Sequence, residues 1–162
     1  MLRKPSRAFK IALAAIIAAV YVAMVLLLQP ISYGPLQFRL ATIVAGATPV
    51  FGAPAIAGFL IGQFISNTMS PLGPIDLLSP LAAAIGLTCT YYLRKKSVML
   101  GLTILSVILA LWVATMLMIV FGVPWLITFS YLVPGIWAPT ALLGYILYKV
   151  LRRYYPEEVE TT

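Results

Sequence analysis

Residues 40–75 read LATIVAGATPVFGAPAIAGFLIGQFISNTMSPLGPI, a stretch of 36 residues without a charged side chain. A helix needs roughly 20 apolar residues to cross the ~30 Å hydrocarbon core of a membrane. The stretch therefore forms either one long kinked helix or two short helices. In the second case the break falls in residues 49–54, which contain two prolines and a glycine. The choice between the two decides how often the chain crosses the membrane.

The positions of Lys and Arg favour two short helices. Positively charged residues accumulate on the cytoplasmic side of membrane proteins. Two short helices bring all three basic clusters of the chain to one side and leave only Arg39 elsewhere, whereas one long helix would separate the second cluster from the others. The clusters are Arg3, Lys4, Arg7 and Lys10; Arg94, Lys95 and Lys96; and Lys149, Arg152 and Arg153.

We therefore predict an all-α integral membrane protein with six transmembrane helices and cytoplasmic N- and C-termini. It forms a single membrane domain over residues 1–162, with helices at approximately 8–28, 35–49, 54–70, 74–93, 98–121 and 131–149 and a cytoplasmic tail at 150–162. The second helix is short, since 15 residues span only ~22 Å. A secretory signal is the alternative for the N-terminus, but the apolar run 11–28 is long for one and no A-x-A-like site precedes Gln29.

The composition excludes most enzyme classes. Apolar residues make up 62% of the chain and charged residues 9%, against ~45–50% and ~25% in soluble domains. There is no His, one Cys, and four Asp and Glu, of which only Asp76 lies outside the last six residues. Catalytic triads, carboxylate pairs, His/Cys metal sites and a phosphate-binding loop all lack their components. We predict that the protein is not an enzyme, and that its net charge of +7 reflects membrane orientation rather than nucleic-acid binding.

Small residues recur at helical spacing on two of the predicted helices. Gly58 and Gly62 form a G-x-x-x-G pair that permits close helix packing in lipid, and we favour a partner helix within the chain. An alanine row runs along the first helix, where an internal and an external partner are equally compatible with the spacing. Its members are Ala8, Ala12, Ala15, Ala19 and Ala23.

Arg39 and Asp76 are the only charges outside the cytoplasmic sets. Ionisable residues within membrane helices are costly and usually face a cavity or a partner, so we favour a binding site. The alternatives are an interfacial Arg39 with Asp76 capping a helix, or an ion pair between the two.

Polar and aromatic residues gather at the same predicted outer level and indicate a small-molecule site open to the outside. Aromatic rings would stack on a flat ligand while amide and charged groups contact its polar edge. An interfacial aromatic belt alone explains Trp125 and Phe129, but not Asn67 beside Arg39 and Asp76. The predicted site residues are Asp76, Arg39, Asn67, Gln37, Tyr33, Trp125, Trp137 and Tyr131.

The segment PISYGPLQFRL (30–40) resembles the first-loop signature of QueT-type S components, the substrate-binding subunits of energy-coupling factor (ECF) transporters. GFLIG (58–62) through Asn67 and GPID (73–76) resemble the next block of the family, and GYILYK (144–149) is a more general match. The resemblance implies a six-helix S-component fold in a prokaryotic plasma membrane, with a pocket near the outer face covered by the first loop.

The resemblance also implies partners and a substrate class. Ala12, Ala15, Ala19 and Ala23 would dock on a transmembrane T component, and two cytoplasmic ATPases would use ATP, so that this chain itself needs no cofactor. The expected substrates are queuosine precursors, which are deazaguanine bases. The chain has Thr42 and Ile136 where the family usually has acidic residues, which leaves Asp76 to accept hydrogen bonds from such a ligand.

The sequence is compatible with three functions. In the preferred one, Asp76 accepts hydrogen bonds from the ligand, and Asn67 and Gln37 add amide contacts. Arg39 touches the ligand or holds the first loop through Asp76. Stacking on the ligand or closure of the pocket falls to Tyr33, Trp125 and Trp137. A stand-alone carrier or channel would use Arg39 and Asp76 to line a path. A structural or assembly protein would use the small residues only for oligomerisation.

Overall fold

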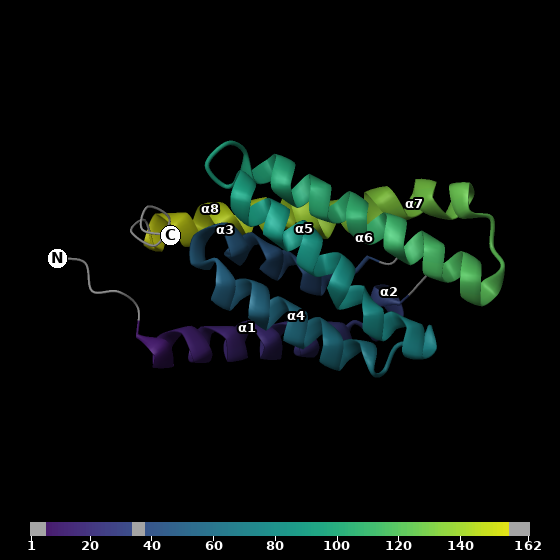
Figure 1. Cartoon of the computed structure of the whole chain (residues 1–162), viewed down its shortest axis with the longest axis horizontal. Coiled ribbons are helices and arrows are strands. Elements are labelled where there is room, and N and C mark those ends of the chain that lie inside the picture. Colours follow the sequence, from purple (N-terminus) through teal and green to yellow (C-terminus); the bar gives the residue numbers. More distant parts are fainter. Residues whose placement is uncertain (1–5, 34–37, 156–162) are drawn as a thin grey trace.

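The computed structural model describes residues 6–33 and 38–155, and these residues are helical or in short turns, without a β-strand. The prediction of an all-α fold is thus confirmed. The elements are α1 (Arg7–Leu27), α2 (Gln29–Ser32), η1 (Leu40–Ala47), α3 (Thr48–Phe51), α4 (Ala53–Asn67), η2 (Gly73–Leu78), α5 (Ser79–Leu93), α6 (Val98–Phe121), α7 (Trp125–Trp137), η3 (Ala138–Leu143) and α8 (Gly144–Tyr154). Figure 1 shows them side by side along one axis.

The uncharged stretch 40–75 breaks at Gly52, where φ is +62° and ψ is −128°. L side chains rarely adopt this backbone conformation, and an added Cβ would also lie 2.8 Å from the Tyr91 ring. Pro54 then occupies the first turn of α4, where its missing N–H costs nothing. The chain therefore forms two short helical segments rather than one kinked helix.

Several helix bounds differ from the prediction. The second helical segment begins at Leu40 and ends at Phe51, while the helix after it spans Ala53–Asn67 and so ends three residues early. The last helix begins at Trp125, six residues before the predicted start, because Gly122 closes α6 in a left-handed conformation and Pro124 directly precedes α7. Continuous helix then runs to Tyr154 through a π-helical segment, η3, that follows Pro134.

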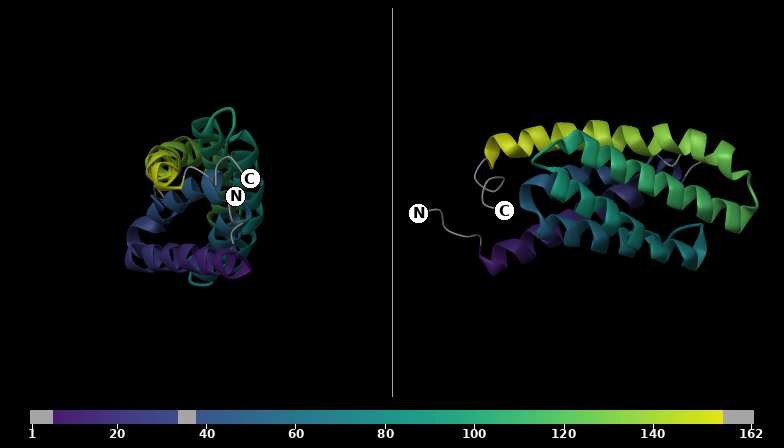
Figure 2. Two further views of the ribbon diagram at one scale, coloured as in Figure 1. Left: turned by 90° about the vertical axis from the view of Figure 1, so that its left-hand side faces the viewer. Right: turned by 45° about the horizontal axis from the view of Figure 1, so that its top comes forward.

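The described parts of the three basic clusters lie at one end of the bundle. The start of α1, the α5–α6 turn and the end of α8 share that end, on the left of Figure 1, and in Figure 2 α1 and α8 lie on opposite sides of the bundle. The end of α1, the end of α4 and the α6–α7 turn lie at the other end. This is the arrangement that the charge pattern requires if the basic end is cytoplasmic.

Four helical segments are long and apolar enough to cross a membrane: Arg7–Leu27, Gly73–Leu93, Val98–Phe121 and Trp125–Tyr154. Leu40–Phe51 and Ala53–Asn67 are apolar but shorter. Neighbouring helices bury Leu40–Phe51, in which Ala45 and Val50 have no exposed surface. Ala53–Asn67 buries one face, which includes Phe59, and exposes another, which includes Ile61 and Phe64. Short helices are tolerated at membrane depth when protein surrounds them.

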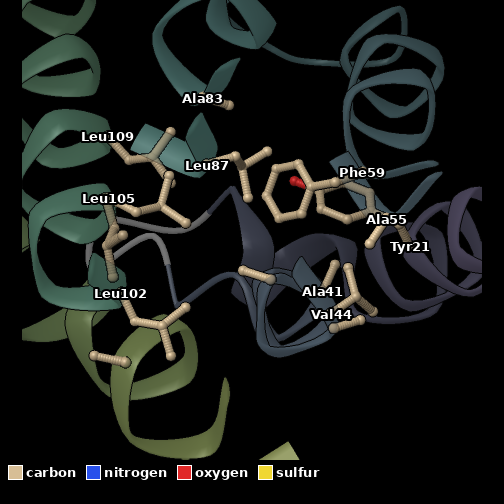
Figure 3. Close-up of a cluster of buried hydrophobic side chains, with 14 of the residues drawn as sticks. Tyr21, Ala41, Val44, Ala55, Phe59, Ala83, Leu87, Leu102, Leu105 and Leu109 are labelled. Carbon is tan, nitrogen blue, oxygen red and sulfur yellow. The ribbon is translucent and has the colours of Figure 1, made fainter. Parts of the chain in front are cut away.

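The core is built on close contacts between small residues. Gly58 and Gly62 of α4 lie against the backbone of Ala14 and Ala18 of α1, so the G-x-x-x-G pair packs within the chain. At the crossing of η1 with α8, a Cβ on Gly46 would lie 2.0 Å from the carbonyl oxygen of Gly144. Between these contacts Tyr21 and Phe59 pack edge to face, and Leu102, Leu105 and Leu109 extend along one face of α6 (Figure 3).

Candidate ligand-binding site

Arg39 is buried, with 8% of its surface exposed, at the start of η1. Its Nη2 donates hydrogen bonds to the hydroxyl of Tyr33, at 3.1 Å, and to the side-chain oxygen of Asn67. The guanidinium also lies over two aromatic rings, with its Cζ 5.1 Å from the Tyr33 centroid and 5.9 Å from that of Tyr21. These contacts fix the position of a cation that would be costly to bury alone.

Asn67 joins Arg39 to Asp76. Its amide nitrogen donates to the backbone oxygen of Asp76 at 2.8 Å and to the carboxylate Oδ1 at 3.0 Å. The carboxylate also accepts from the Ser79 hydroxyl, which in turn accepts from the indole N–H of Trp112 at 2.9 Å. The charged pair is therefore connected through an amide, and the network extends from η1 through α4 and α5 to α6.

A small cavity of about 20 Å³ lies beside this network. Its polar lining comes from Tyr21, Arg39, Thr42, Gln63, Ser79 and Trp112. Its apolar lining comes from Leu109, Val113 and Ile136. Helices α1, α4, α5, α6 and α7 and the segment η1 all contribute, so that segments far apart in the sequence meet at one point.

Three polar atoms of the lining residues have no hydrogen-bond partner although they are buried. They are the hydroxyl of Tyr21, the Nε of Arg39 and the side-chain oxygen of Gln63. An unsatisfied buried polar group costs about 1–3 kcal/mol, so native proteins contain few of them. Of the seven such side-chain atoms among the described residues, three belong to residues that line this one cavity. The set contains a hydroxyl, an N–H donor and a carbonyl acceptor.

The predicted site residues fall into three groups: those that line the cavity or hydrogen-bond to Arg39 and its partners, one outside the described residues, and the aromatic residues of the last helix. Arg39 lines the cavity, and Tyr33, Asn67 and Asp76 hold Arg39 directly or through one another. Gln37 lies outside the described residues.

The aromatic residues of the last helix have other contacts. The indole N–H of Trp125 donates to Thr115 at 3.2 Å, and that of Trp137 donates to Thr103 at 3.1 Å, so both fasten α7 to α6. Tyr131 is half-buried and packs against the core. None of the three belongs to the lining of this cavity.

Sequence reasoning missed Tyr21, Gln63, Ser79 and Trp112 as lining residues. Gln63 carried a usable signal, because it is an amide in the middle of an otherwise apolar helix. Thr42 and Ile136 both line the cavity. The Thr42 hydroxyl donates to the Arg39 carbonyl at 2.8 Å and accepts from Thr140 at 2.7 Å.

The alanine row lies on the exposed side of α1. Ala12, Ala15, Ala19 and Ala23 are exposed, whereas the intervening Ala18 packs against α4. This face has no partner among the described helices that buries it.

A bundle of apolar helices, four of them long enough to cross a membrane, indicates a multi-pass membrane protein. The particular family follows from the sequence: the chain belongs to the QueT transporter family, whose profile matches residues 11–153. The resemblance in the first loop is thereby confirmed. No curated protein and no solved structure matches the chain.

Proposed function

We propose that this protein is the S component of an ECF-type importer and captures a small planar heterocycle at the outer face of a prokaryotic plasma membrane. The observation that carries the proposal is the convergence of three unpartnered buried polar atoms on one cavity. A ligand that satisfies them would recover the free energy that their burial costs. The expected ligand class is that of the queuosine precursors, as the family resemblance implies.

Ligand binding requires the cavity to enlarge. A volume of about 20 Å³ accommodates about one water molecule, whereas a heterocycle needs several times more. We propose that side chains from α6 and α7 move outward when the ligand enters. Pro134 and the π-helical segment η3 interrupt the regular hydrogen bonding of this helix close to the Ile136 lining position, and such irregularities lower the cost of bending.

We assign Asp76 a role that differs from direct ligand contact. Its Oδ1 is already an acceptor for Asn67 and Ser79, and Asp76 is 2% exposed. In this proposal the hydrogen bond from Asn67 to Asp76 orients the Asn67 amide, and the hydrogen bond from Arg39 to Asn67 orients the guanidinium. The Nε of Arg39, which has no partner, is then available to a ligand in the cavity. Direct acceptance from the ligand by Asp76 stays a prediction of the sequence.

The exposed alanines of α1 would form the docking surface for a transmembrane T component. Small side chains permit close approach of a second helix in lipid, and Ala12, Ala15, Ala19 and Ala23 are exposed together. Two cytoplasmic ATPases would act from the basic end of the bundle. We further propose that all six helical segments cross the membrane with both termini in the cytoplasm.

Uptake into cells tests this function. Cells that produce this protein together with a T component and two ATPases should accumulate a radiolabelled deazaguanine, and cells with this protein alone should not. The Arg39→Ala variant serves as the binding-defective control. Accumulation without the partners would instead indicate a stand-alone carrier. Absence of both uptake and binding across deazaguanines and vitamins would contradict the proposal and favour a structural role.

A further inference from the structure

The residues that line the cavity have a positive formal charge. Arg39 is the only ionisable group with a formal charge at neutral pH among its lining residues, and the lining contains no carboxylate. The other polar groups of the lining residues are neutral: the Tyr21 hydroxyl, the Gln63 amide, the hydroxyls of Thr42 and Ser79, and the Trp112 indole. A ligand in this cavity therefore meets a positive potential at close range.

The nearest carboxylate is separated from the cavity by other groups. Asp76 reaches Arg39 only through the Asn67 amide, and its Oδ1 accepts from Asn67 and Ser79. The Nη2 of Arg39 is bound to two neutral oxygens, those of Tyr33 and Asn67. The positive charge of Arg39 is thus hydrogen-bonded but not directly paired, and its Nε–H has no acceptor.

We propose that this cavity selects its ligand by an electron-rich acceptor, a carboxylate or a carbonyl, and rejects a ligand that carries a positive charge there. The acceptor group receives hydrogen bonds from the Arg39 Nε and the Tyr21 hydroxyl, and an adjacent N–H donor of the ligand binds the Gln63 oxygen. This inference rests on the proposed function and narrows the substrate class to ligands whose group beside Arg39 is a neutral or anionic acceptor.

The inference assigns different tasks to two charged residues. Arg39 sets the sign of the charge preference because it touches the ligand. Asp76 is a positioning residue, and it partly offsets the guanidinium through space. Removal of the Arg39 charge should therefore abolish the preference for anions, whereas removal of the Asp76 charge should increase it.

Three probes of nearly identical shape test the preference: benzoate, benzamide and benzamidine, which are anionic, neutral and cationic. Their dissociation constants are measured with the purified full-length protein in detergent at constant ionic strength. We expect benzoate and benzamide to bind and benzamidine to bind at least about tenfold more weakly. Equal or tighter binding of benzamidine would overturn the proposal. Failure of all three to bind would also overturn it, because the cavity would then hold a water molecule only.

Isosteric variants sharpen the test. Gln63→Glu adds a carboxylate to the lining and should abolish the preference for benzoate over benzamidine, because the new negative charge cancels the formal charge of Arg39. Gln29→Glu, the same change at an exposed position on α2, should leave the order unchanged. If Gln63→Glu does not fold, Arg39→Gln replaces it and should weaken benzoate about tenfold while changing benzamide less than about threefold. Equal weakening of all three probes by Arg39→Gln would mean that Arg39 acts only as a structural residue.

The charge preference and the proposed function fail in distinguishable ways. Uptake that depends on the T component and ATPases, combined with preferential binding of benzamidine, would refute the charge preference and keep the S-component function. The expected probe order in a protein whose uptake is independent of those partners would keep the charge preference and refute the S-component function.

Discussion

Two regions of the bundle differ in how they are packed. Where η1 crosses α8, a methyl group on Gly46 would lie 2.0 Å from the carbonyl oxygen of Gly144, so the crossing leaves no space for it. Around Arg39, polar atoms are buried without partners in residues that line a cavity. In the proposed function, the glycine crossing is the rigid part of the fold, and the region around Arg39 is the part that a ligand would complete.

The largest effect is expected at the glycine crossing. Gly46→Ala places a Cβ 2.0 Å from a backbone oxygen that cannot move aside, so we expect a loss of about 3 kcal/mol or more of stability. Gly122→Ala is the control, because that glycine has a positive φ but no atom within 4 Å of an added Cβ, and it should cost only about 1–2 kcal/mol. Melting temperature and yield of monodisperse protein measure both; equal losses would show that the crossing is not tightly packed.

The next effect concerns the amide between the two charges. Asn67→Ala removes three hydrogen bonds that connect Arg39 and Asp76 and should lower stability by about 2–3 kcal/mol. Ligand affinity should fall as well, since Arg39 loses its orientation. Thr68→Ala, at the exposed neighbouring position, should change neither quantity. Normal ligand affinity in a folded Asn67→Ala protein would contradict the positioning role.

Two tyrosine variants compare a hydroxyl that has hydrogen-bond partners, that of Tyr33, with one that has none, that of Tyr21. The Tyr33 hydroxyl accepts from Arg39 and donates to the Ser66 carbonyl, so Tyr33→Phe should cost about 1 kcal/mol. The Tyr21 hydroxyl has no partner, so Tyr21→Phe should leave stability unchanged or raise it by up to about 1 kcal/mol. Ligand affinity should nevertheless fall about tenfold in Tyr21→Phe, which corresponds to ~1.4 kcal/mol. Calorimetric melting measures stability, and ligand titration measures affinity. If both variants lower stability to a similar extent, the Tyr21 hydroxyl is not unsatisfied in the free protein.

The smallest effect on the protein itself is expected on the outer face of α1. Ala19→Leu changes an exposed position and should leave the melting temperature unchanged while reducing co-purification of the T component. Ala18→Leu, one residue away, faces Gly62 of α4 and should destabilise the protein. Retention of the T component by Ala19→Leu would place the docking surface elsewhere.

Much of the architecture follows from charge and from helix-breaking residues. The basic clusters predicted one common end for the start of α1 and the end of α8, and the prolines around Gly52 indicated the break in stretch 40–75. The start of the last helix was wrong because Trp125 and its aromatic neighbours resembled a loop at the membrane interface. No local signal distinguishes that loop from a helix whose first turn lies at the same level.

The site was harder to predict than the fold. Arg39, Asn67 and Asp76 were identified because charged and amide groups are rare in apolar helices. Tyr21 and Trp112 could not be identified in this way, since a tyrosine or tryptophan in an apolar helix most often packs in the core. Their contribution depends on the approach of α1, α4 and α6 around Arg39, which no single helix encodes.

A structure of the protein with a bound deazaguanine or vitamin ligand would test the central claim most directly. The account predicts that the ligand occupies the cavity beside Arg39, with hydrogen bonds from the Arg39 Nε and the Tyr21 hydroxyl and to the Gln63 oxygen. A ligand bound elsewhere, with a single water molecule between these three groups, would contradict it.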